Sequence, residues 1–171
     1  MVIVKISPAL LLVALAASPR TQDVSTYRHP ALPVSIEAPT GWEAGAWRDD
    51  PGVLEVAAPD GSVQVLLWFT DTEQSADRYL AKMVGMKPVE PAGPVRKIDI
   101  GERPAWRVEA TGSEQGQDGI AETFIAMDVG PGFPGEGTLV LQVWCPERLR
   151  ADHATLIDGI VASLRVEPES G

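Results

Sequence analysis

Short runs in which apolar and polar residues alternate, punctuated by glycine and proline, constrain the fold of this chain more than any other feature. In the first run, every second residue is apolar: Leu32, Val34, Ile36 and Ala38. Runs of the same kind follow over residues 42–48, 53–58, 63–69, 95–100, 106–110, 120–129 and 138–145. A two-residue period is typical of strands that bury one face. The 16 glycines and 15 prolines suit the many turns that such strands need.

Two further segments, 72–85 and 147–164, carry apolar residues at helical spacing. Thr70 and Glu73 fit a capping box ahead of the first helix, and residues 89–94 after it are predicted to be a loop. Short connections between strands, such as the turn Pro59-Asp60-Gly61-Ser62, require antiparallel pairing, and each amphipathic helix needs a sheet to bury its stripe. We therefore predict an α+β fold with an antiparallel β-sheet of about 7–8 strands and two or more flanking helices.

The first 18 residues have the layout of a signal peptide. Lys5 precedes a short apolar run, and Ala14-Leu15-Ala16 supplies a small-x-small cleavage pattern. The run is about ten residues long, against the ~20 that a transmembrane helix needs, and the alternative is a helix of the folded domain. We expect an exported protein, periplasmic or secreted, with this division: 1–18 cleaved signal peptide, 19–26 flexible lead-in, 27–166 single domain, 167–171 tail.

The composition argues against several classes of function. A formal net charge of −10 disfavours nucleic acid as a partner, because phosphate backbones need a basic surface. One cysteine and two histidines provide no disulfide framework and no thiolate zinc site, and there is no D-x-D-x-D-G run for calcium. We therefore expect neither a metal nor a cofactor. Cys145 falls on the apolar parity of its strand and is predicted to be a buried, unreactive thiol.

Three features of the chain occur together in one known group of domains. They are the P-x-G-W sequence at Pro39-Thr40-Gly41-Trp42, a mid-chain helix after a β-hairpin, and the closing helix that ends in Ile160-Val161-Ala162-Ser163-Leu164. In these features the chain resembles the PsbP-like domains, which include Ran-binding Mog proteins and bacterial DcrB-type exported proteins. The resemblance covers about residues 27–166. It implies an α/β/α sandwich and a non-enzymatic binding or assembly role, and it brings no catalytic residues.

Patterns that could carry catalysis are weak. Gly130–Gly135 matches G-x-G-x-x-G, but a strand follows where a dinucleotide site needs a helix, so we interpret it as a hairpin loop. There is no G-x-S-x-G elbow, and His153 lies on the apolar stripe of the last helix, where a histidine is usually packed. Glu122 and Asp128 interrupt an apolar strand face, which a solvated strand end would explain. A hydrolase would have to draw on these or on the remaining candidate carboxylates, Asp49, Asp50 and Glu109.

The five tryptophans are the least ordinary feature of the composition. Trp106 shares the parity of apolar neighbours and is predicted to lie in the core. Trp68 and Trp144 have the opposite parity to Leu67 and Val143 of the same strands, so they are buried only if both sheet faces are covered. Burial is the commoner arrangement. If one face is open, Trp47, Trp68 and Trp144 form an exposed aromatic platform.

The leading functional hypothesis is an exported, non-enzymatic binding or assembly module. Its partner would be a protein or a small apolar ligand, and the candidate binding residues are Trp47, Trp68, Trp144 and Phe133, the last at the tip of the 130–137 loop. A small hydrolase that uses acidic residues and a protein-binding chaperone are the alternatives.

Overall fold

Antiparallel pairing organises the chain into two sheets. The computed structural model describes residues 23–87, 89–114, 117–130 and 133–167, so the predicted signal peptide, 1–18, lies outside the described residues. The larger sheet has eight strands in the order β3-β4-β5-β10-β9-β8-β6, and β7 also pairs with β8. The smaller sheet has the order β1-β2-β11.

The elements have the following bounds. The larger sheet contains β3 (Glu43–Trp47), β4 (Asp50–Ala57), β5 (Gln64–Asp71), β6 (Val89–Pro91), β7 (Arg96–Ile100), β8 (Arg103–Glu114), β9 (Gln117–Val129) and β10 (Gly137–Pro146). The smaller sheet contains β1 (Val24–Arg28), β2 (Val34–Pro39) and β11 (Arg165–Val166). The helices are α1 (Ala76–Met86), a 3-10 turn η1 (Glu147–Leu149) and α2 (Arg150–Ser163).

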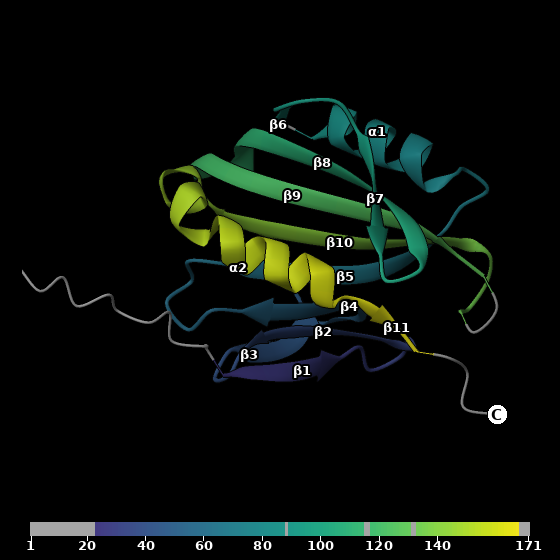
Figure 1. The fold of residues 1–171 in the computed structure, drawn as a ribbon, viewed down its shortest axis with the longest axis horizontal. Coiled ribbons are helices and arrows are strands. Elements are labelled where there is room, and N and C mark those ends of the chain that lie inside the picture. The colour runs from purple at the N-terminus through teal and green to yellow at the C-terminus, as the bar shows by residue number, and fades with distance from the viewer. Residues whose placement is uncertain (1–22, 88, 115–116, 131–132, 168–171) are drawn as a thin grey trace, which may run out of the picture.

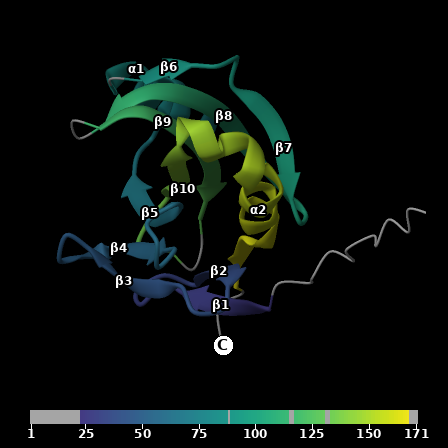
Figure 2. The same cartoon turned by 90° about the vertical axis from the view of Figure 1, so that its left-hand side faces the viewer.

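The two α-helices lie on opposite faces of the larger sheet (Figure 1). Figure 2 shows the sheet curling around α2, which shares the inner face with the three-stranded sheet, while α1 lies outside. The predicted α+β fold with an antiparallel sheet and helices on both faces is confirmed. No helix of the described residues is long and apolar enough to cross a membrane.

Strand parity divides the apolar side chains between two cores. The inner core joins the larger sheet to α2 and β2, and it includes Leu67, Leu141 and Cys145. Cys145 is fully buried, and burial raises the pKa of its thiol, as expected for an unreactive cysteine. The outer core lies under α1, where Leu80 packs among residues of β8, β9 and one residue of β10, Val140. The outer core therefore covers only part of the outer face.

The turn between β4 and β5 forms as its sequence predicts. The Ser62 N–H donates to the Asp60 carboxylate at 2.9 Å, and Gly61 takes a positive φ of 69°. The Ala58 N–H closes the hairpin on the Val63 carbonyl at 2.9 Å. Hydrogen bonds from Ser62 also lower the pKa of the Asp60 carboxyl. An Asx-type turn therefore fixes the register of these two strands.

Several boundaries differ from those expected. The capping-box prediction is wrong, because Thr70 belongs to β5 and α1 begins only at Ala76. The Ala76 N–H donates instead to the Asp128 carboxylate on β9, at 2.7 Å. Residues 89–94 are not wholly a loop, since Val89–Pro91 pairs with β8.

The smaller sheet accounts for the differences at the two ends of the domain. β1 begins at Val24, inside the segment 19–26 that the sequence suggested as a lead-in, and pairs with β2. At the other end the Glu167 N–H donates to the Pro33 carbonyl at 2.7 Å. The Glu167 carboxylate also pairs with Arg28, so this residue belongs to the domain rather than to a tail. Residues 168–171 lie outside the described chain.

Candidate functional site: an aromatic pocket on the open sheet face

The part of the outer face that α1 leaves uncovered lies over β4, β5 and β10. Antiparallel register places Val53 of β4 opposite Trp68 of β5, and Leu66 of β5 opposite Gln142 of β10. Trp144 follows Gln142 on the same parity of β10, opposite Gln64. Side chains of one parity from three neighbouring strands thus meet on one surface.

These side chains line a pocket of about 290 Å³. Its lining consists of Trp47, Val53, Leu66, Trp68, Lys87, Gln142 and Trp144. The three tryptophans singled out from the sequence therefore come together in one place, and each is only half-buried. The three rings are neither fully buried nor fully exposed, and together they form an aromatic surface around the pocket.

Trp47 reaches the pocket from β3 because of a tight turn. Arg48 and Asp49 both take positive φ, 50° and 64°, the geometry of a two-residue hairpin turn with right-handed twist. Trp47 pairs with Asp50 across that turn. The Arg48 guanidinium lies 4.5 Å from the Trp47 ring centroid, in a cation–π contact. The end of the β3–β4 hairpin thus forms one wall.

Hydrogen bonds across the strands hold Trp144 in place. Its indole N–H donates to the Gln64 side-chain oxygen, and the Gln64 amide in turn donates to the Glu55 carboxylate. The chain of bonds runs from β10 through β5 to β4. The only polar atom of the ring is therefore satisfied within the protein, and the ring is left to offer apolar surface.

A buried ionic group closes the pocket on the side of α1. Lys87, the C-cap residue directly after α1, lies 3.6 Å from the Glu122 carboxylate and 4.9 Å from the centroid of the Phe124 ring. Gln142 donates its amide to the same carboxylate. Glu122 is fully buried, so its prediction as part of a solvated strand end is wrong. Lys87, directly after α1, supplies the compensating cation.

The fourth candidate binding residue, Phe133, lies elsewhere. Its ring packs against Phe69 with 5.8 Å between centroids, beside the inner core, and it does not line the aromatic pocket. Trp106 packs on the outer core, as expected, and Trp42 on the inner one. Three of the five tryptophans therefore belong to the pocket and two do not.

The carboxylates considered for hydrolysis are not brought together. Glu109 is on β8 and Glu122 on β9, but Glu109 pairs with Thr123, so the two carboxylates project from opposite faces. Asp128 is used at the start of α1, and Asp49 and Asp50 are exposed at the β3–β4 turn. This placement offers no paired carboxylates of the kind glycoside hydrolysis requires.

The histidines are likewise separate. The Nδ1 of His29 accepts the Ala31 and Leu32 N–H groups at 3.1 and 3.2 Å, and its Nε2 donates to the Gly52 carbonyl at 3.1 Å. Burial lowers the pKa of His29, although the bond to Gly52 acts in the opposite direction. The ring therefore serves as a structural bridge between the β1–β2 connection and β4. His153 is half-buried on α2.

Comparison with known proteins identifies the fold. No protein-family profile and no curated protein matches the sequence. Among solved structures, cyanobacterial PsbP (CyanoP) from Synechocystis sp. PCC 6803 is 11% identical with a TM-score of 0.59, over 89% of this chain and 98% of that one. LpqN, involved in cell envelope biogenesis of Mycobacterium tuberculosis, is 14% identical with a TM-score of 0.59, over 85% and 91%.

A third similar structure is the Ran-binding protein Mog1p of Saccharomyces cerevisiae. It is 10% identical with a TM-score of 0.54, over 85% of this chain and 96% of that one. At such identities the likeness concerns the fold and not the site. The resemblance that the sequence motifs suggested is confirmed at that level: the chain has the PsbP-like fold that PsbP, LpqN and Mog1p share.

Proposed function

We propose that the chain is an exported, non-enzymatic binding module that takes a flat apolar group of a small ligand into the aromatic pocket. The observation that carries the proposal is the meeting of Trp47, Trp68 and Trp144 around one pocket on the part of the outer sheet face that α1 leaves uncovered. Half-buried indoles at one spot are unusual on a solvated surface and are typical of ligand sites.

The size and chemistry of the pocket define the ligand class. A volume of about 290 Å³ is at the small end of the range for ligand sites, so it suits one ring system or a short apolar chain. Trp144 is already oriented by Gln64, which reduces the ordering cost of binding. Lys87 and Gln142 at the edge supply polar contacts that would orient a ligand carrying one polar group.

Export is supported by the sequence of residues 1–18 and is in keeping with the fold's occurrence in LpqN, a protein of cell envelope biogenesis. The exported protein would begin after the small-x-small pattern at Ala14-Leu15-Ala16. N-terminal sequencing of the protein recovered from outside the cytoplasm tests this part. An intact Met1 would contradict it.

Titration with N-phenyl-1-naphthylamine, a neutral apolar fluorophore, tests the pocket. We expect saturable binding with a rise in probe fluorescence. Trp68→Ala removes one wall and should weaken binding about tenfold or more, as loss of an aromatic anchor does. Trp42→Ala is the matched control, because it removes another half-buried tryptophan that lies outside the pocket.

The two variants separate the possible outcomes. Both are first checked for native circular dichroism, so that loss of fold is not taken for loss of binding. Weak binding by Trp68→Ala together with near-normal binding by Trp42→Ala supports the proposal. Equal binding by both variants, or no saturable binding by the native protein, would overturn it.

A further inference from the structure

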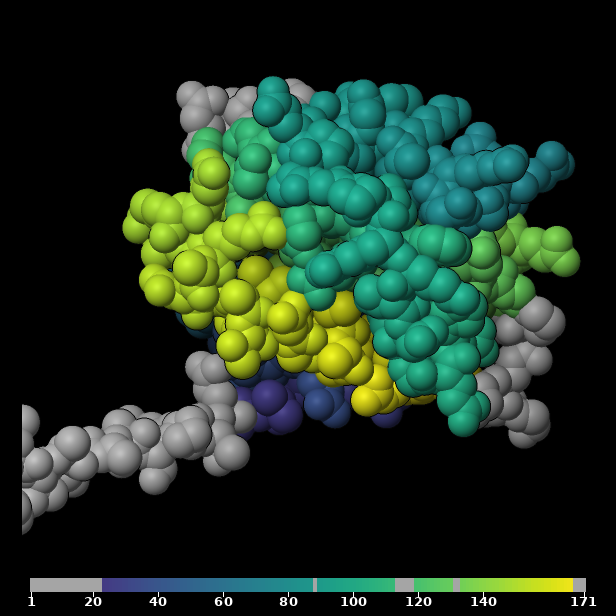
Figure 3. Space-filling view, turned by 45° about the horizontal axis from the view of Figure 1, so that its top comes forward, coloured from purple at the N-terminus to yellow at the C-terminus, as the bar shows by residue number. Residues whose placement is uncertain are grey.

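A second hollow, on the opposite side of the larger sheet, gathers positive charge. It lies where the β6–β7 connection, Ala92-Gly93-Pro94, leaves the edge of β8, and it has a volume of about 580 Å³. Figure 3 shows this side of the molecule, where the yellow-green start of α2 approaches the teal β6–β7 segment. The pocket is separate from the aromatic pocket, since the two share no lining residue.

The hollow exists because the edge pairing is interrupted. β7 pairs with β8 as far as Arg107, and β6 pairs with it again only from Ala110. Between them the Ala92 N–H donates to the Glu109 carbonyl at 2.8 Å, and the chain then leaves the sheet at Gly93 and Pro94. Two residues of β8 are thus left at the floor of an opening rather than inside a ladder.

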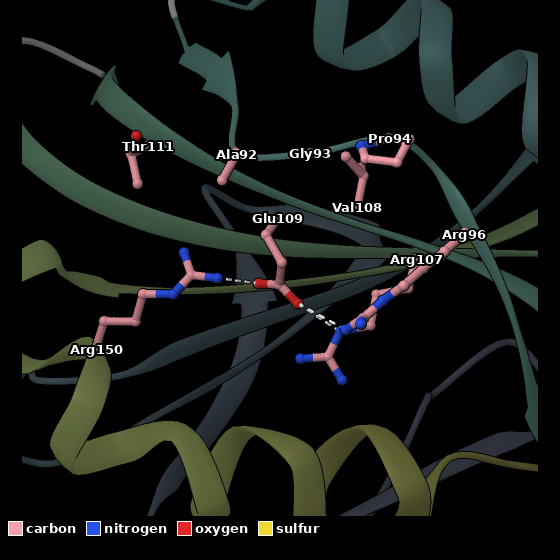
Figure 4. Close-up of a pocket in the computed structure, with 9 residues that line it drawn as sticks. All are labelled: Ala92, Gly93, Pro94, Arg96, Arg107, Val108, Glu109, Thr111 and Arg150. Carbon is pink, nitrogen blue, oxygen red and sulfur yellow. Dashed lines mark hydrogen bonds and ion pairs between the residues drawn. The ribbon is translucent and has the colours of Figure 1, made fainter.

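One carboxylate in this hollow is surrounded by donors. Glu109 accepts from Arg107 Nε at 2.5 Å on Oε1, and from Arg150 Nη2 at 2.5 Å and Thr123 Oγ1 at 2.6 Å on Oε2. Figure 4 shows Arg107 and Arg150 reaching it from two sides. Arg96 stands further away, with its Nη2 3.8 Å from Oε1.

The positive groups outnumber the negative ones. Three arginines line the hollow and Glu109 is its one carboxylate, while Asp158, which pairs with Arg107 at 2.7 Å, lies outside it and is largely exposed. Burial alone would lower the pKa of Arg107, but bonds to Asp158 and Glu109 outweigh it and raise that pKa, so the charge persists. In a chain of net charge −10 this excess of cations is unusual.

We propose that the arginine hollow binds a small molecule through a phosphate or carboxylate group. The guanidinium groups of Arg96 and Arg150 would hold the oxyanion, because each uses at most one of its nitrogens on Glu109 in the contacts above. Arg96 is 60% exposed and Arg150 32%, so both remain accessible from solvent. The volume accommodates a ligand several times larger than a phosphate ion.

Side-chain and backbone NMR with two probes, inorganic phosphate and citrate, tests the proposal at constant ionic strength in chloride. We expect saturable shifts of the Arg96 and Arg150 Nε–H signals and of the Gly93 amide. The probe with the higher affinity identifies the preferred oxyanion. Arg96→Ala should weaken binding about tenfold, as loss of a charge-assisted hydrogen bond does.

Lys97→Ala is the matched control, because Lys97 is an exposed cation on the same strand that does not line the hollow. It should change affinity less than twofold. Equal weakening by the two variants, or shifts that rise linearly without saturation, would overturn the proposal. Trp68→Ala should leave phosphate and citrate binding unchanged. A negative result for the arginine hollow is therefore distinguishable from a negative result for the aromatic pocket.

Discussion

Glu122 on β9 and Trp144 on β10 are direct partners in the antiparallel register, yet Glu122 is fully buried and Trp144 is only half-buried. The boundary of the α1 cover runs between them. On one side the sheet face packs into the outer core, and on the other it opens into the aromatic pocket. Lys87 lies at that boundary. It pairs with the buried Glu122 carboxylate and also lines the pocket, so it contributes both to the stability of the fold and to the shape of the site.

Lys87→Met should be strongly destabilising. It leaves the Glu122 carboxylate buried without this cation, and loss of one partner of a buried ion pair costs on the order of 3 kcal/mol. Urea unfolding of the variant measures the cost. The double variant Lys87→Met, Glu122→Gln should recover most of the stability, because no buried charge then remains. A single variant within about 0.5 kcal/mol of the native protein would contradict the pairing.

Asp128→Ala should destabilise α1. The side chain of the N-cap residue, Ser75, makes no capping hydrogen bond. The Asp128 carboxylate accepts the Ala76 N–H instead. Loss of such a cap costs about 1 kcal/mol of stability, and Asp128→Asn should retain most of the stabilisation. Thermal unfolding of both variants, with Asp71→Ala as an exposed control, measures the difference. Equal losses at positions 71 and 128 would refute the capping role.

Stability should fall on acidification because of His29. Its folded-state pKa lies below the ordinary 6.5, so below pH 6.5 the unfolded chain binds a proton that the folded protein does not. Between the folded-state pKa of His29 and pH 6.5, the free energy of unfolding therefore rises with pH. The contribution of His29 to stability is lost as the pH falls from 6.5 toward that folded-state pKa. Protonation at Nδ1 would also break two backbone bonds.

The pH series is measured on the native protein, His29→Gln and His153→Gln. The change of unfolding free energy with pH between about 6.5 and 5 should flatten in His29→Gln and persist in His153→Gln. The slope, and not the absolute stability, is the readout, so a less stable variant still answers the question. An unchanged slope in His29→Gln would contradict the assignment.

Gly137→Ala should be destabilising by about 2 kcal/mol, since an added methyl group overpacks the site. A Cβ at Gly137 would lie 2.3 Å from the Thr70 carbonyl oxygen and 3.0 Å from the Phe69 ring. Gly135→Ala is the control, because a Cβ there meets nothing within 4 Å. Chemical unfolding of the two variants should differ by most of that amount. Similar stabilities would show that β5 and β10 can separate at this point without cost.

Periodicity was a sound guide wherever one face of a strand is buried. Alternation placed Val65 and Leu67 on the inner face and left Trp68 on the other, as observed. The Asp60 and Gly61 turn was predictable because its chemistry is local. The extent of α1 cover is not local, so the sequence left the exposure of Trp68 and Trp144 open.

Features that depend on distant contacts were missed. β11 is two residues long and forms only because β2 offers it an edge, so no periodicity announces it. The Asp128 cap joins residues 52 positions apart. The Arg96, Arg107 and Arg150 cluster draws on three elements, and only the alternation of Arg107 and Glu109 on one strand face hinted at it.

The indole N–H signals of the five tryptophans give the most direct test of the aromatic pocket. They are recorded in ¹H–¹⁵N spectra during titration with N-phenyl-1-naphthylamine. We expect saturable shifts for Trp47, Trp68 and Trp144, with Trp42 and Trp106 unmoved. Shifts confined to Trp42 or Trp106, or uniform small shifts of all five, would contradict it.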